Sequence, residues 1–326
     1  MGTDDGSSGW WKRLTGWLLP RELTRRARWF AWASLVTEIA IVGTGGSVRL
    51  TASGLGCPTW PLCTPESLVP VEALGIHGLI EFSNRMMSGV VAIVALFTFL
   101  FLVRQRRTRP ELFWLSFSLG VLVLAQAGIG GITVLSNLES YIVGLHFVIS
   151  AIMVVLAAAL VWFVHLPAER AAPLPGWMRG LAWVTAAVTA VTVLVGVLTT
   201  GSGPHAGDLG TSRNGLPTEI MEHVHAWPAY ALFGLTVLVV LVAWRRGFAV
   251  TRYFALWLLG IEFLQIAVGL YQSRNGLPAL AVGVHMVLAC LLLSAMTAVV
   301  LATVRPRTAQ KGSSGSIPTA TKSSVR

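Results

Sequence analysis

The sequence predicts an all-α integral membrane protein. Its eight transmembrane helices are expected to form two pseudo-symmetric four-helix bundles, with both termini in the cytoplasm. Three observations lead to this fold class: a low charge content, long apolar runs and an internal repeat. Of the 326 residues, 54% are hydrophobic and 12% are charged, whereas soluble globular chains carry about 25% charged residues. This composition favours a lipid bilayer as the surroundings of the chain.

Eight apolar runs are long enough to cross a bilayer, which takes about 20 predominantly apolar residues. No Asp, Glu, Lys or Arg occurs from Met86 to Val103 or from Tyr141 to Val164. In lipid the backbone must satisfy its own hydrogen bonds, so these runs are expected to be helical. The predicted spans are residues 29–50, 77–103, 112–134, 140–164, 180–200, 219–243, 253–272 and 278–303.

Basic residues are concentrated in alternate connections between the spans. Both tails, together with residues 104–111, 165–180 and 244–252, hold 20 of the 24 Lys and Arg residues. Basic loops stay in the cytoplasm. We therefore expect a multi-pass protein of the cell membrane with both termini in the cytoplasm. The net charge of +10 is thus distributed as membrane topology requires, which argues against nucleic acid as a partner.

The two halves of the chain resemble each other. Gln126 and His146 are 20 residues apart, and so are Gln265 and His285. Each half has four predicted helices that start on the same side, so the repeat is parallel. Other corresponding pairs are Gly130 with Gly269, Leu138 with Leu277, and Gly144 with Gly283.

This repeat divides the chain into five expected parts. They are a basic cytoplasmic tail 1–28 that is disordered over residues 1–9, an N-terminal bundle 29–164, a cytoplasmic linker 165–179, a C-terminal bundle 180–304, and a disordered cytoplasmic tail 305–326.

Two histidines of the second half are candidate haem ligands. His225 and His285 lie on apolar spans near their predicted outer ends. A histidine pair from facing helices is the usual way a helical bundle holds haem iron. The alternative for each residue is a hydrogen bond between helices. His223 lies two residues from His225, points to another helix face and could be the ligand instead; we prefer His225 because it matches Asn84 in the repeat. His146 matches His285 in the repeat.

A polar stripe lies at the start of the second span. His77, Glu81, Asn84 and Arg85 share one helix face, at i, i+4, i+7 and i+8. Ionisable groups inside a span are functional candidates by default, and Glu81 is the best of them. Two interpretations of Arg85 stay open: an ion pair with Glu81 that stabilises the helix end, or a contact to a haem propionate.

The three cysteines fall into two classes. Cys57 and Cys63 lie in the first outer loop, in a compartment that permits disulfides. Their spacing suits a small disulfide loop, which is either structural or redox-active. Two thiols alone are an incomplete zinc site. Cys290 is interpreted as a small apolar core residue.

Several of these motifs, in this order, resemble the heme A synthase family over about residues 30–304. The segments that carry the resemblance are TASGLGC at 51–57, WPLC at 60–63, IEFSNR at 80–85, QAGIGG at 126–131, LHF at 145–147 and GLPT at 215–218, together with His225 and His285.

The resemblance implies a reaction and its site. Members oxidise the C8 methyl group of heme O to a formyl group, which yields heme A for cytochrome oxidase. It implies a heme B cofactor held by His225 and His285. It also implies a substrate haem in the N-terminal bundle beside His146 and Glu81, with electrons arriving through heme B. The Cys pair is linked to activity in the family, and the heme O farnesylating synthase is an implied partner.

The chain departs from the family pattern in two places. Asn84 stands where many members have His, so the iron of the substrate haem would be held by His146 alone or together with His77. The third outer loop, residues 201–208, lacks a second cysteine pair. The chain is therefore similar to the one-pair variants found in some Gram-positive members.

Two other functions compete with the enzyme. One is a membrane di-haem b-type electron carrier, which Asn84 and the Glu81–Arg85 stripe disfavour. The other is a transporter with a parallel repeat. It would need helices that are broken at the middle of the membrane, and a proline in the middle of a span would suggest such a break; we expect none. The sequence leaves open the electron donor, a homo-oligomeric state, and the roles of Glu38 and Glu262.

Overall fold

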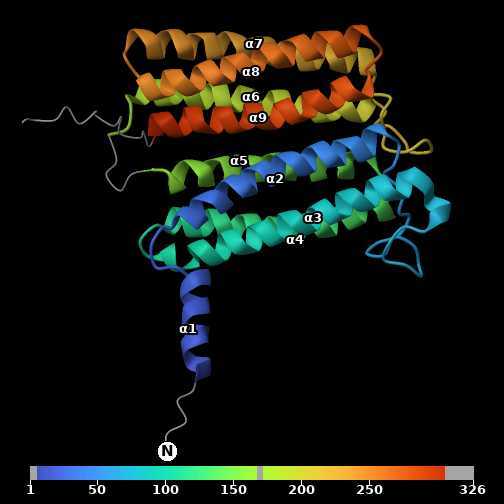
Figure 1. Ribbon diagram of the computed structural model, residues 1–326. Helices are drawn as coiled ribbons and strands as arrows, with labels where there is room; N and C mark the ends of the chain where they lie inside the picture. Colours follow the sequence, from blue (N-terminus) through green and yellow to red (C-terminus); the bar gives the residue numbers. More distant parts are fainter. Residues whose placement is uncertain (1–5, 167–171, 305–326) are drawn as a thin grey trace, which may run out of the picture.

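The computed structural model describes residues 6–166 and 172–304, and their regular structure is helical (Figure 1). Eight helices in this part of the chain are long and apolar enough to cross a membrane, which confirms the eight predicted spans. The predicted tail 305–326 and residues 167–171 of the predicted linker lie outside the described residues. The helices are α1 (Gly6–Leu18), α2 (Arg25–Leu50), η1 (Glu72–Leu74), α3 (Gly75–Leu102), η2 (Val103–Arg106), α4 (Pro110–Leu135), α5 (Ser140–Val164), α6 (Gly176–Ser202), α7 (Thr218–Arg245), α8 (Ala249–Arg274) and α9 (Ala279–Val304).

Most of the helices extend the predicted spans by a few residues, about one turn at most, and local capping explains where two of them begin. The Thr24 hydroxyl accepts a hydrogen bond from the N–H of Ala27 at 3.2 Å, so α2 starts at Arg25 rather than at residue 29. Pro110 is the first residue of α4, where its missing N–H is not needed.

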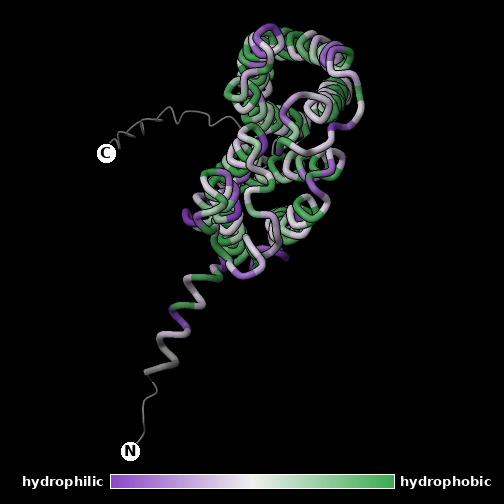
Figure 2. The backbone as a smooth tube through the Cα atoms, turned by 90° about the vertical axis from the view of Figure 1, so that its right-hand side faces the viewer, coloured by the Kyte–Doolittle hydropathy of each residue, from purple (hydrophilic) through white to green (hydrophobic). Residues whose placement is uncertain are grey.

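The long helices run side by side, and α2–α5 and α6–α9 form two neighbouring groups (Figures 1 and 2). Each group contains a buried apolar cluster. Helix α9 also packs on α2 and α5, and its Cys290 and Ala302 belong to the cluster of the first group. This confirms that Cys290 is a buried core residue. Apolar side chains on the outside, such as Leu124 at 74% exposure, face the surroundings as lipid contact requires.

The two ends of the bundle differ in composition. The disulfide end, on the right in Figure 1, carries the connections 51–74, 136–139, 203–217 and 275–278. The arginine-rich end, on the left, carries the connections 19–24, 103–109 and 246–248. The candidate site residues of the sequence analysis lie at or near the disulfide end.

Two expectations were wrong. Helix α1 starts at Gly6, so residues 6–9 are helical rather than disordered; the ring of Trp17 packs on Phe101 of α3, with centroids 5.6 Å apart, and holds this helix against the bundle. Pro228 lies inside α7, although we expected no proline in the middle of a span. Membrane helices tolerate proline because neighbouring helices and local adjustments satisfy the carbonyl that it frees, and α7 continues to Arg245.

Candidate functional site

Cys57 and Cys63 form a disulfide, as predicted, and both residues are fully buried. They close residues 57–63, here named the disulfide loop, in the connection between α2 and α3. Trp60 of this loop packs on α4. Its indole ring lies so close to Gly131 that a Cβ at this position would be only 2.6 Å from the ring. Glycine at 131 is therefore what allows the loop to approach the helix that faces His146.

Glu81 and Arg85 hold the disulfide loop against α3. Arg85 Nη2 donates to Glu81 Oε1 at 2.6 Å, so the ion pair exists. The other Glu81 oxygen accepts from the backbone N–H of Cys57 at 2.6 Å. The Arg85 guanidinium also donates to four carbonyl oxygens of the loop, those of Cys57, Thr59, Pro61 and Leu62. In this structure both side chains thus bind the loop backbone.

The other two residues of the polar stripe contact α2 and the chain that follows it. His77 is exposed, and its Nδ1 lies 2.9 Å from the Ser53 hydroxyl. Asn84 is half-buried, and its Oδ1 accepts a hydrogen bond from the Thr44 hydroxyl at 2.7 Å. The four side chains share one face of α3, as predicted, but they have separate partners.

His146 of α5 faces α4 with one nitrogen unpaired. Its Nδ1 is buried and has no hydrogen-bond partner. A Cβ at Gly130 would lie 3.5 Å from its Cε1, so a glycine stands opposite the ring. The Gln126 amide donates to the His146 carbonyl at 3.0 Å and to Ser150 Oγ at 2.6 Å. These bonds fix α5 against α4 around the imidazole.

His225 and His285 meet inside the second group of helices. Their ring centroids are 6.3 Å apart and the rings are inclined by 75°. The Nδ1 atoms of both rings are buried without a hydrogen-bond partner. Glycines stand opposite both rings: a Cβ at Gly196 would lie 2.8 Å from His225 Cε1, and one at Gly269 would lie 3.5 Å from His285 Cε1. The structure therefore brings together the two histidines that the sequence singled out.

The remaining described histidines have backbone partners. His223 is exposed, and its Nδ1 lies 2.8 Å from the carbonyl oxygen of Glu219 in its own helix. His165 pairs in the same way with Val161. His205 Nε2 lies 2.8 Å from the Leu277 carbonyl oxygen. It thus ties the 203–217 connection to the turn before α9.

Comparison with known proteins identifies the family. The family model COX15-CtaA, described as cytochrome oxidase assembly protein, matches residues 28–297. The chain belongs to this family. It is 29% identical to Heme A synthase of Lysinibacillus sphaericus over 299 residues, which cover 86% of this chain and 96% of the relative. It is 26% identical to Heme A synthase of Exiguobacterium sibiricum over 264 residues (78% and 87%), and 31% identical to that of Geobacillus kaustophilus over 136 residues (41% and 42%). The matches confirm the resemblance seen in the sequence.

Helix α8 of this family member carries a polar stripe. In the sequence analysis Glu262 and Gln265 were named separately, and it was not recognised that they share one helix face. Glu262, Gln265, Gly269 and Gln272 share one helix face at i, i+3, i+7 and i+10. Glu262 Oε1 accepts from the Thr236 hydroxyl at 2.7 Å, whereas Glu262 Oε2, Gln265 Oε1 and Gln272 Oε1 are buried without a partner. The helical spacing of these polar residues was the signal that could have revealed the stripe.

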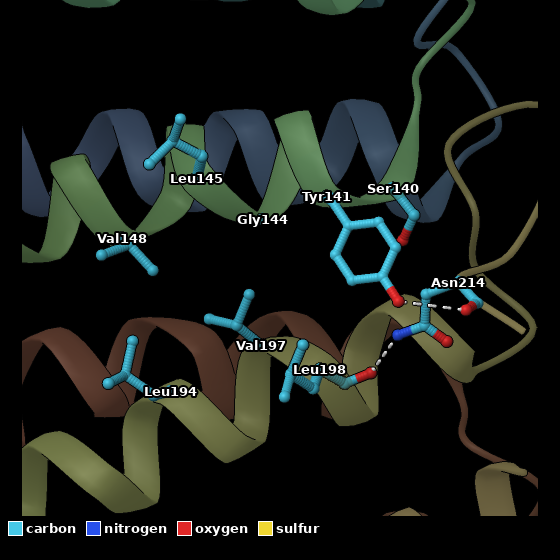
Figure 3. A pocket seen from close by; sticks show the side chains of 9 residues that line it. All are labelled: Ser140, Tyr141, Gly144, Leu145, Val148, Leu194, Val197, Leu198 and Asn214. Atoms are coloured by element: carbon cyan, nitrogen blue, oxygen red, sulfur yellow. Dashed lines mark hydrogen bonds between the residues drawn. The ribbon is translucent and has the colours of Figure 1, made fainter. Parts of the chain in front are cut away.

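A groove also lies between α5 and α6, where the two groups of helices of this family member meet (Figure 3). It encloses about 220 Å³ and is mostly apolar, with Val148 and Val197 on its walls. Tyr141 and Asn214 close it toward the disulfide end, where the Tyr141 hydroxyl donates to the Asn214 carbonyl at 3.3 Å. The candidate histidines and Glu81 do not line it.

Proposed function

We propose that this chain is a heme A synthase that oxidises the C8 methyl group of heme O to a formyl group, making heme A for cytochrome oxidase. The observation that carries the proposal is the half-buried pair of His225 and His285, whose rings lie edge to face and whose Nδ1 atoms are buried without a partner. Relatives matched over most of the chain are named Heme A synthase. We place the protein in the cell membrane, with both termini and the arginine-rich end in the cytoplasm, because of the Lys and Arg distribution.

The histidine pair suits a haem better than a bare metal ion. A structural metal site takes about four protein ligands, whereas a haem iron needs only axial ligands from the protein. Buried polar atoms are rarely left unpaired, so the two Nδ1 atoms indicate that the rings serve a ligand.

We assign this site to a heme B cofactor in a C-terminal bundle, residues 180–304. When bound, heme B supplies an iron that takes up and passes on single electrons. The chain itself supplies the two imidazoles, Gly196 that makes room for His225, and apolar helices that limit the access of water. The donor of the electrons stays unassigned.

We assign the substrate haem to an N-terminal bundle, residues 29–164, with His146 as its iron ligand. Two features support a repeated site: Gly130 stands opposite His146 as Gly269 stands opposite His285, each with a Cβ-to-Cε1 distance of 3.5 Å. The disulfide loop lies over the same region through Trp60 and Gly131. The two bundles would then be related by pseudo-symmetry.

In this proposal Glu81 serves the reacting methyl group as an acid–base or positioning residue, and Arg85 keeps it in place. Because Glu81 also binds the Cys57 amide, the state of the disulfide loop would affect the position of the carboxylate. Asn84 is a poor iron ligand, so His146 alone or together with His77 would hold the substrate iron. Hydrophobic heme O would be handed over within the membrane by the farnesylating synthase.

The test is extraction and chromatography of haem from protein purified from cells that supply heme O. We expect heme B together with heme A or an oxidised intermediate. His285→Ala should lose heme B, while His223→Ala, the control on an exposed histidine, should retain it. Unmodified haem alone, with heme O shown to be present, would favour an electron carrier. Normal heme A production by Glu81→Gln at normal protein level would remove Glu81 from its role.

A further inference from the structure

Helix α1 has an apolar face and a basic face. Trp10, Trp11, Leu14, Trp17 and Leu18 recur at i, i+1, i+4, i+7 and i+8, which places them on one side of the helix. Lys12, Arg13 and Gly16 fall on the other side. A helix with tryptophan and leucine on one face and basic residues on the other has the composition of one that lies in a membrane surface.

The direction of α1 matches that location. Both views show α1 running across the direction of the spanning helices and away from the bundle, and Figure 1 shows that it leaves at the arginine-rich end (Figures 1 and 2). Spanning helices point along the membrane normal, so α1 runs in the plane of the membrane surface.

Trp17 fixes this direction. Its ring packs edge-on against Phe101 of α3, with centroids 5.6 Å apart, and Arg26 of α2 lies over it with Cζ 4.7 Å from the centroid. The last turn of α1 is thus attached to two spanning helices. Earlier in the helix, Trp10 and Trp11 are each 56% exposed, although tryptophan is an expensive side chain to leave in water.

Two further arginine–tryptophan contacts at the same end of the molecule are typical of the lipid headgroup region. Arg246 lies over the ring of Trp177 at 5.6 Å, and Arg252 lies over that of Trp244 at 5.3 Å. Trp gathers at membrane–water interfaces because one side of the ring is apolar and the N–H is polar. The arginine-rich end therefore lies at the level of the lipid headgroups, and α1 leaves the bundle at that level.

We propose that α1 binds the membrane surface at the arginine-rich end, with Trp10, Trp11 and Leu14 among the upper acyl chains and Lys12 and Arg13 on anionic phospholipid headgroups. The charge of this segment indicates which partner binds α1. Residues 6–28 contain six basic residues and one acidic residue. A second copy of the same helix would be repelled, whereas anionic lipids attract such a segment. The inference is independent of haem chemistry.

The test uses the full chain with Cys290→Ala, reconstituted in nanodiscs that contain phosphatidylglycerol and a shallow doxyl-lipid quencher. Single cysteines carry an environment-sensitive dye at Trp11 or Leu14 on the apolar face, and at Lys12 or Gly16 as matched controls on the basic face. We expect several-fold stronger quenching at 11 and 14 than at 12 and 16. Equal quenching on the two faces, or none on either, would overturn the proposal.

Two further measurements separate lipid binding from other causes. Lys12→Glu with Arg13→Glu should reduce quenching at position 14 several-fold, and so should discs of phosphatidylcholine alone. Haem content, read from the absorbance of the same samples, should not change, since α1 does not contact the histidine sites. Shielding of position 14 that persists in detergent and grows with protein concentration would assign the face to a second copy and overturn the lipid proposal.

Discussion

At the residue scale, a glycine decides where His225 lies. His225 is placed against α6 only because residue 196 has no side chain. At Gly130 opposite His146, and at Gly269 opposite His285, an added Cβ would lie 3.5 Å from the ring, an ordinary van der Waals distance, so these two glycines are not strictly required. Polar side chains inside a span are costly, so the space around each imidazole is a property that single substitutions can test.

Gly196→Ala should lower the haem content of the purified protein several-fold while helix content remains. The added methyl would lie 2.8 Å from His225 Cε1, and such overpacking typically costs about 1–3 kcal/mol, so the ring must move. Gly234→Ala in α7, which has nothing within 4 Å of the new methyl, is the matched control and should keep its haem. Equal haem content in the two variants would contradict a site at His225.

Arg85→Gln should make the Cys57–Cys63 disulfide easier to reduce. The substitution removes the Glu81 ion pair and donors to four loop carbonyls, and even one hydrogen bond to a charged group contributes about 1.5–3 kcal/mol. The rate of reduction by dithiothreitol, followed by alkylation and mass spectrometry, should rise several-fold, and the melting temperature should fall. Arg274→Gln, at an exposed position on α8, should change neither quantity. An unchanged reduction rate would mean that Arg85 does not hold the loop.

At the element scale, the connections at the disulfide end tie the two groups of helices together. Arg49, in the last turn of α2, donates to the carbonyl oxygens of His205 at 2.7 Å and Thr200 at 3.0 Å. The N–H of Gly54 donates to the Gly207 carbonyl at 2.8 Å. The α2–α3 and α6–α7 connections therefore behave as one structural unit.

Arg49→Gln should loosen this unit and expose the 203–217 connection to protease. Trypsin cleavage after Arg213, measured on the purified protein by mass spectrometry, is expected to be several-fold faster than in the unsubstituted chain. Ser47→Ala is the control, because the Ser47 hydroxyl bonds only to the Gly43 carbonyl of its own helix. If both variants are cut at the same rate, the Arg49 contacts do not hold the connection.

At the scale of the whole molecule, the distribution of charge determines how the bundle sits in the membrane. Most arginines in the described part of the chain lie at the end opposite the disulfide loop. Basic loops stay in the cytoplasm, while a disulfide needs an oxidising compartment. Two independent rules thus support the orientation that we propose.

This orientation predicts which engineered cysteines an impermeant maleimide can reach in intact cells. In a Cys290→Ala background, Arg213→Cys should be labelled without permeabilisation, and Arg107→Cys only after it. The disulfide protects the other two cysteines. The opposite labelling pattern would show that the bundle is inverted.

Much of the fold was predictable because its cause is local. The eight spans follow from runs of apolar residues in a solvent that leaves the backbone no partner but itself. The histidines 225 and 285 were identifiable because polar residues are rare in such runs. Helix α1 was missed because its apolar face spans only a few turns, and it is held by the contact of Trp17 with Phe101.

The sequence by itself determined the number of spans, the family motifs and the pairing of Cys57 with Cys63, since each depends on composition or close spacing along the chain. Only the tertiary structure decided that Glu81 and Arg85 bind the disulfide loop, that Arg49 reaches across to His205, and that glycines face the histidines. These contacts join residues from different helices or loops, and a hydrogen bond forms only where two atoms come within about 3 Å. That distance depends on how helices pack, which no local pattern in one chain specifies.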